Sequence, residues 1–167
     1  MDRKVNIYIE IEKDSNMKYE FNKETKKLEL DRILPYPYRY PYCYGYITNT
    51  LALDGDELDC LIITDKEIEK DKHYEAYIVG VLVMSDEKGM DEKILCVLEE
   101  DYATIDNLNK LSKEILDNIN WFFCHYKSKT PGKWSRVNGF REKEVAIQIY
   151  RRACFFYASE KMKEALC

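Results

Sequence analysis

The stretch Asp54-Gly55-Asp56-Glu57-Leu58-Asp59-Cys60-Leu61-Ile62-Ile63 decides how the rest of the chain is interpreted. Asp and Gly are typical of a turn, and Gly55 allows a backbone conformation that a bulkier residue resists. The apolar residues from Leu58 onward predict a short buried strand with Asp59 at its mouth. Carboxylates this dense repel one another unless a cation lies among them, and Mg²⁺ is a hard ion that suits oxygen ligands. From these residues alone, a metal site and a solvated surface loop stand about even.

A second acidic, glycine-containing segment at residues 85–93 favours the metal site. It is predicted to be a turn, and it lies between two apolar runs, 76–84 and 94–98, which both predict strands. If these strands close into a small sheet, both acidic turns lie together at one end of it. We therefore expect the two turns to share a metal site.

The segment ahead of the first acidic turn predicts further strands. Residues 5–12 alternate apolar and polar side chains with the period of a half-buried strand. Residues 18–21 and 28–30 continue this alternation as the two arms of a hairpin. The following stretch, 35–46, contains three prolines and is expected to be extended rather than helical.

The period changes in the last third of the chain. Ser112 is a predicted N-cap, and apolar residues then recur in steps of three and four as far as Tyr126. A second helix follows a predicted turn at Asn138-Gly139. Its apolar stripe is Val145, Ile149, Ala153 and Phe156. Strands first and helices last indicate an α+β domain, with helices packed on a small barrel or sheet.

Composition sets the broad class of the protein. A chain of 167 residues is expected to form one domain over residues 1–167. Its net charge of −5 argues against a nucleic-acid or anionic-membrane partner. We find no run long enough to span a membrane and no signal-peptide core in residues 1–6, which predicts a cytoplasmic location. The six scattered cysteines show no C-x-x-C spacing and are expected to be reduced.

Short motifs follow one another along the chain in a specific order. They are Ile9-Glu10-Ile11, Lys18-Tyr19-Glu20, Asp31-Arg32, Tyr40-Pro41 with Tyr44-Gly45, Asp54-Gly55-Asp56-x-x-Asp59, Asp86-Glu87-x-Gly89-x-Asp91-x-Lys93, Phe122-Phe123-x-x-Tyr126-Lys127 and Gly132-Lys133-Trp134. Each is weak alone, but the ordered set resembles the family I soluble inorganic pyrophosphatases of the bacterial type. The resemblance implies a small closed OB-like β-barrel with C-terminal helices packed against it, Mg²⁺-dependent hydrolysis of pyrophosphate, and a homohexamer.

The resemblance also implies a role for each matching position. Asp54, Asp59 and Asp91 would ligate the tightest metal ion. Asp59 would be shared with a second ion, so that a water lies between the two, and Asp56 would orient that water and accept its proton. Further metal ligands would be Asp86, Glu20 and Glu10. The two phosphoryl groups would be held by Lys18, Arg32, Tyr44, Lys93, Tyr126 and Lys127.

Charge shows why several metal ions are expected. The seven carboxylates and four Lys or Arg side chains of this set carry a net charge of −3, and pyrophosphate adds roughly three to four negative charges more. About three to four Mg²⁺ ions per site, with Mn²⁺ as a substitute, bring the total near zero. Direct attack by a metal-activated water then needs no covalent intermediate.

Two alternatives stay open at this point. One is an ion-binding module without catalysis, although the acidic turn lacks the EF-hand's twelve-residue spacing. The other is an oligonucleotide-binding barrel, which the acidic balance disfavours. Release of phosphate from pyrophosphate, measured with and without Mg²⁺, separates the three hypotheses.

Overall fold

The computed structural model describes residues 4–167. Residues 1–3 lie outside this description. They are half of residues 1–6, in which the sequence predicts no signal-peptide core. The elements in chain order are β1 (Lys4–Ile11), β2 (Met17–Asn22), β3 (Lys27–Ile33), β4 (Cys43–Ile47), β5 (Leu58–Ile62), β6 (Lys72–Asp86), β7 (Gly89–Val97), α1 (Glu99–Tyr102), the 3-10 turn η1 (Leu108–Lys110), α2 (Lys113–His125), β8 (Ser135–Glu142) and α3 (Lys143–Leu166).

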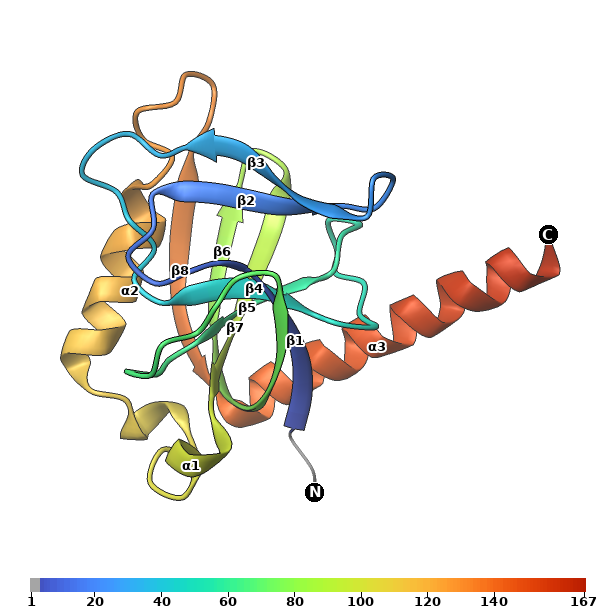
Figure 1. Ribbon diagram of the computed structural model, residues 1–167. Coiled ribbons are helices and arrows are strands. Elements are labelled where there is room, and N and C mark those ends of the chain that lie inside the picture. The colour runs from blue at the N-terminus through green and yellow to red at the C-terminus, as the bar shows by residue number, and fades with distance from the viewer. Residues whose placement is uncertain (1–3) are drawn as a thin grey trace.

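Five of these strands close into a hydrogen-bonded ring in the order β1-β4-β5-β7-β6 and back to β1 (Figure 1). The ring closes because β6 is 15 residues long. Its first half pairs with β1, and its second half pairs with both β7 and β8. The hairpin of β2 and β3 forms a separate two-stranded sheet beside the ring. The expected α+β fold is confirmed, with a closed ring of strands and helices toward the C-terminus.

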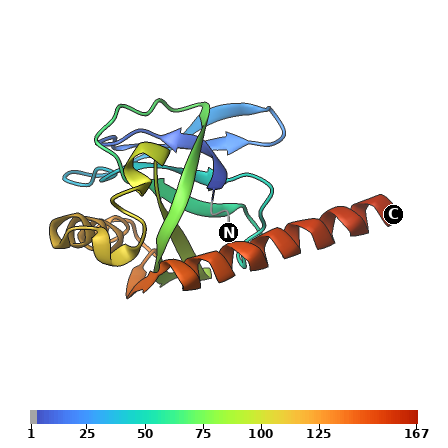
Figure 2. The ribbon, with the colours of Figure 1, turned by 90° about the horizontal axis from the view of Figure 1, so that it is seen from below.

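Two apolar clusters hold the helices against the strands. One contains barrel residues together with Ala146, Ile149 and Ala153 of α3, and the other contains Phe122 and Phe123 of α2. The second half of α3 extends away from the barrel, as Figure 2 shows. Among residues 4–167, no helix has the length and apolar character needed to cross a membrane.

The predicted turn at Asn138-Gly139 is wrong, because both residues lie inside β8. Pairing with β6 continues through them with a shift of register, and Gly139 has φ 106°. This geometry is a β-bulge, in which a glycine at positive φ accommodates an extra residue without ending the strand. The dipeptide that often makes a turn here bends a strand instead.

One strand boundary and one helix face also differ from expectation. The second acidic turn is only two residues long, because β6 continues to Asp86 and β7 begins at Gly89, so Asp91 and Lys93 lie on a strand. On α3, Val145 is 37% exposed, while its neighbours Ala146 and Ile147 are buried. Helix α3 begins directly after β8. Which face of α3 is buried therefore depends on tertiary packing, which overrides the local pattern of the sequence.

Candidate active site

A cleft of about 790 Å³ opens between the β2–β3 hairpin, the barrel and the end of α2. Every residue of the predicted site lines it. These residues are Glu10, Lys18, Glu20, Arg32, Tyr44, Asp54, Asp56, Asp59, Asp86, Asp91, Lys93, Tyr126 and Lys127. The fold thus brings together, in one cleft, side chains from the seven strands β1 to β7, from the loop before β5 and from the residues that follow α2.

Both acidic turns are shaped by their first aspartate. Asp54 Oδ1 accepts a hydrogen bond from the backbone N–H of Asp56 at 3.0 Å. Asp86 Oδ1 accepts one from the N–H of Lys88 at 2.9 Å. Such Asx turns explain why aspartate occupies these positions. They also fix the direction of the remaining carboxylate oxygen in each turn.

Lys93 lies at the centre of the acidic wall. Its Nζ contacts Asp59 Oδ2 at 2.8 Å and Asp91 Oδ2 at 2.9 Å, and it donates to the Tyr44 hydroxyl at 2.6 Å. Parallel pairing of β5 with β7 sets Asp59 opposite Lys93. Burial disfavours the charged ammonium, but Asp59, Tyr44 and Asp91 together favour it more strongly, so the pKa of Lys93 is raised well above its usual value. Lys93 is therefore a fixed positive charge.

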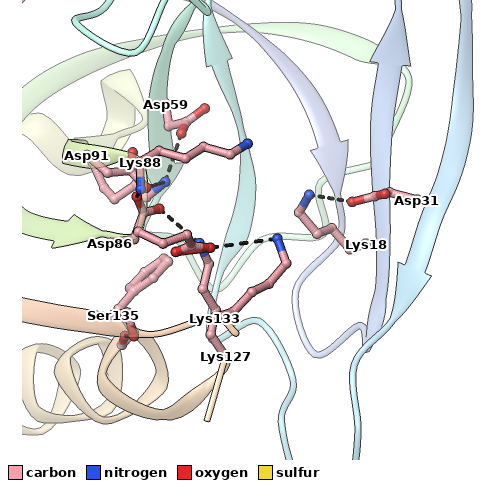
Figure 3. A network of polar contacts seen from close by, with 12 residues as sticks. Lys18, Asp31, Asp59, Asp86, Lys88, Asp91, Lys127, Lys133 and Ser135 are labelled. Atoms are coloured by element: carbon pink, nitrogen blue, oxygen red, sulfur yellow. Dashed lines mark hydrogen bonds and ion pairs between the residues drawn. The ribbon is translucent and has the colours of Figure 1, made fainter. Parts of the chain in front are cut away.

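Lys127 makes a second cationic centre, at the end of α2. Its Nζ contacts Asp86 Oδ2 at 2.9 Å and Glu87 Oε1 at 3.2 Å (Figure 3). Burial raises the pKa of Asp86, but the hydrogen bonds from Lys127 and from the backbone N–H of Lys88, with the Lys127 charge, together lower it by more, so the net pKa is lowered. On the opposite side of the cleft, Lys18 of β2 pairs with Asp31 of β3 at 2.7 Å.

The acidic residues nearest the barrel are electrostatically crowded. Burial, reinforced by the charges of Asp59 and Glu20, raises the pKa of Glu10 to about 8, although Glu10 accepts a hydrogen bond from a backbone N–H. Burial also raises the pKa of Asp54 and of Asp91. Additional positive charge in the cleft would relieve this crowding.

Arg32 has a buried donor that makes no hydrogen bond. Its Nε is buried and has no hydrogen-bond partner. A buried donor without a partner costs about 1–3 kcal/mol. An anion bound in the cleft would remove that cost.

Sequence reasoning assigned no role to six charged residues of the cleft lining, although two of them, Asp31 and Lys133, lie inside the quoted motifs. The six are Lys23, Glu24, Asp31, Glu57, Lys88 and Lys133. Three were adjacent to assigned positions: Asp31 precedes Arg32, Glu57 lies within the acidic turn, and Lys88 lies in the second turn. Lys23 carried no such signal. It pairs with Glu57 at 2.9 Å and so connects the hairpin to the acidic turn.

The donor set suits a hard divalent ion. Ten carboxylates and seven Lys or Arg side chains line the cleft, which leaves a net charge of −3. Among residues 4–167, no three acidic, His or Cys side chains gather around one point. The Lys93 ammonium lies between Asp59 and Asp91 and pairs with both. All acidic donors are oxygens, as Mg²⁺ prefers. Neither histidine lines the cleft, and the cysteines within residues 4–167 are all unpaired.

Comparison with known proteins agrees with this arrangement. A family model described as "Inorganic pyrophosphatase" matches residues 7–158. An inorganic pyrophosphatase of Helicobacter pylori is 41% identical over 155 residues, which cover 90% of each chain. A solved H. pylori pyrophosphatase superposes with a TM-score of 0.90 at 40% identity, covering 93% of this chain and 94% of the other.

A more distant structure shares the fold alone. A vacuolar soluble pyrophosphatase of Trypanosoma cruzi, truncated at its N-terminal domain and in complex with PPi, gives a TM-score of 0.88 at 18% identity, covering 97% of this chain and 72% of that one. The barrel is therefore common to proteins of widely diverged sequence. The family model and the two H. pylori proteins show that the chain belongs to the inorganic pyrophosphatase family, of the soluble family I type, and is an inorganic diphosphatase that hydrolyses pyrophosphate.

Proposed function

We propose that the cleft hydrolyses pyrophosphate with Mg²⁺, and that water attacks phosphorus directly without a covalent enzyme intermediate. The observation that carries the proposal is the buried, unpartnered Nε of Arg32 in a cleft otherwise rich in carboxylates. An anion and metal cations satisfy both sides of such a cleft at once. The T. cruzi relative, seen in complex with PPi, supports this choice of anion.

Family membership implies a divalent metal cofactor, and the carboxylates of the cleft are its candidate ligands. Asp54, Asp59 and Asp91 would hold the tightest ion, and Asp59 would be shared with a second. Asp86, Glu20 and Glu10 would hold the rest of about three to four ions, the number that balances the charge. Bound there, the ions would supply positive charge and would lower the pKa of a water in the cleft.

Asp56 is our candidate for the general base. Its side chain is exposed in the cleft. Lys23, which lies near it, pairs with Glu57 instead. A carboxylate with an unpaired oxygen can orient water and take its proton.

The cations of the cleft would hold the phosphoryl groups. Lys93 and Lys127 are anchored by carboxylates, so they would place fixed positive charge beside the substrate. Lys18 and Arg32 face them from the hairpin, which places positive charge on two sides of the substrate. The hydroxyls of Tyr44 and Tyr126 add neutral donors. These groups would stabilise the charge that develops on the departing phosphate.

The test is phosphate release from pyrophosphate with Mg²⁺, Mn²⁺, Ca²⁺ or EDTA. We expect hydrolysis with Mg²⁺, slower hydrolysis with Mn²⁺, and none with EDTA. Asp59→Ala should raise the Mg²⁺ concentration at half-maximal rate, and an unchanged Mg²⁺ titration would reject the bridging role of Asp59. Undiminished hydrolysis in EDTA would reject the metal assignment as a whole.

We also propose, from the family resemblance, that the chain acts as a single domain in the cytoplasm and assembles as a homohexamer. Sedimentation equilibrium of the purified protein tests the assembly. A mass six times that of the 19.9 kDa chain is expected, and a monomer would contradict it.

A further inference from the structure

Helix α3 touches both segments that supply the central carboxylates. Arg152 forms an ion pair through Nη2 with Glu92 of β7. The next residue, Ala153, accepts a hydrogen bond at its carbonyl oxygen from the backbone N–H of Leu51, at 3.0 Å. Leu51 lies three residues before Asp54. One turn of α3 therefore contacts both β7 and the acidic loop, residues 48–57, which contains the first acidic turn.

Glu92 lies between two residues of the cleft on the same strand. Since side chains alternate along a strand, Asp91 and Lys93 point to the cleft while Glu92 points to the opposite face. The residue paired with Glu92 on β6 is Val83, which packs against the apolar cluster that contains Ala153. The Glu92 side chain is only 9% exposed. Arg152 thus binds β7 through Glu92, on the face of the strand that points away from the cleft.

The contact at Ala153 continues into the acidic loop. Leu51 is followed by Ala52, whose N–H donates to the carbonyl of Asp56 at 2.7 Å. Ala52 also accepts from the N–H of Gly55 at 3.1 Å. The loop is therefore a small hydrogen-bonded unit with its base attached to α3.

We propose that Arg152 is a positioning residue for the metal site, which sets the carboxylate of Asp91 on β7 against that of Asp54 on the loop. The inference rests on the proposed assignment of these two aspartates to one ion. Arg152 contacts neither of them and acts through Glu92. No residue of α3 lines the cleft. Through Arg152, the helix would nevertheless affect the metal site.

The effect on metal affinity follows from this indirect contact. Changing a group bonded directly to a ligand costs about 10–100-fold in metal affinity. Arg152 acts one residue away from Asp91, so Arg152→Met should weaken Mg²⁺ binding by about 3- to 10-fold, below the range for direct contacts. Saturating Mg²⁺ should restore most of kcat, since the reacting groups themselves are unchanged.

The experiment measures Mg²⁺ binding to the folded protein by calorimetry at 25 °C, with thermal melting recorded separately. Arg152→Met is compared with Arg152→Lys, which keeps the charge, and with Lys161→Met, which removes an exposed pair to Glu164 on the projecting part of the same helix. Arg152→Lys should recover most of the affinity, and Lys161→Met should bind Mg²⁺ like wild type.

Glu92→Gln keeps the shape of the partner and serves if Arg152→Met does not fold. Weakened Mg²⁺ binding in Glu92→Gln supports the proposal. A lower melting temperature with unchanged Mg²⁺ affinity in these variants overturns it and leaves Arg152 a purely structural residue. If wild type itself binds no Mg²⁺, the metal assignment fails and the positioning role fails with it. If wild type binds Mg²⁺ and the variants bind equally, only the positioning role fails.

Discussion

Replacing Asp56 by asparagine tests the proposed base most directly. The change keeps the size of the side chain and removes only its charge and its capacity to take a proton. The structural contacts of Asp56 are made by its backbone, which donates to Asp54 Oδ1 at 3.0 Å and accepts from Ala52 at 2.7 Å. Asparagine retains both contacts. We therefore expect the free energy of unfolding to change by no more than about 0.5 kcal/mol.

The catalytic loss should be much larger than the structural one. A positioned general base contributes about 10²- to 10⁴-fold to a rate. Since each factor of ten in rate corresponds to about 1.36 kcal/mol, the barrier should rise by roughly 3–5 kcal/mol. The loss should fall on kcat, because Asp56 is assigned neither to the phosphoryl groups nor to a metal.

The assay is steady-state phosphate release at saturating Mg²⁺, accompanied by calorimetric titration of Mg²⁺ and urea unfolding. Asp106→Asn is the matched control, since Asp106 is exposed and lies outside the cleft lining. It should behave as wild type in all three measurements. A kcat within about threefold of wild type in Asp56→Asn, far below the expected loss, would refute the assignment of Asp56 as base.

Three further predictions concern stability and reactivity. Lys93→Met leaves two carboxylates without their ammonium and should cost about 3 kcal/mol in EDTA, with partial recovery in Mg²⁺; equal urea midpoints in both buffers would contradict this. In Gly45→Ala the new Cβ would lie 1.9 Å from the carbonyl oxygen of Tyr8, so β1 and β4 must separate, at about 3 kcal/mol by urea unfolding; a native-like midpoint would speak against it. Burial raises the pKa of the Cys43 thiol to about 12, so iodoacetamide at pH 8 should alkylate exposed Cys167 and spare Cys43 until the protein is unfolded, as mass spectrometry would show.

Local patterns anticipated much of the molecule. The period-two alternation of residues 5–12 and the apolar run 76–84 predicted two strands that form, because side-chain alternation is a property of the strand itself. Ser112 caps α2 as predicted and accepts from the N–H of Ile115 at 3.2 Å. The errors arose where neighbouring elements override local preference. At Gly139 the pairing with β6 carries the strand through a dipeptide that favours a turn elsewhere.

Sequence motifs identified most of the residues that line the cleft, but not all of its charged groups. Short motifs in a specific order identified the family and thirteen residues that all line one cleft, because each motif depends on residue types at a fixed local spacing. Tertiary structure alone decided how these groups meet. Lys93 reaches Asp59 across 34 positions, and Arg152 reaches Glu92 across 60. Contacts at such separations depend on how the barrel closes and where α3 packs, which no local spacing records.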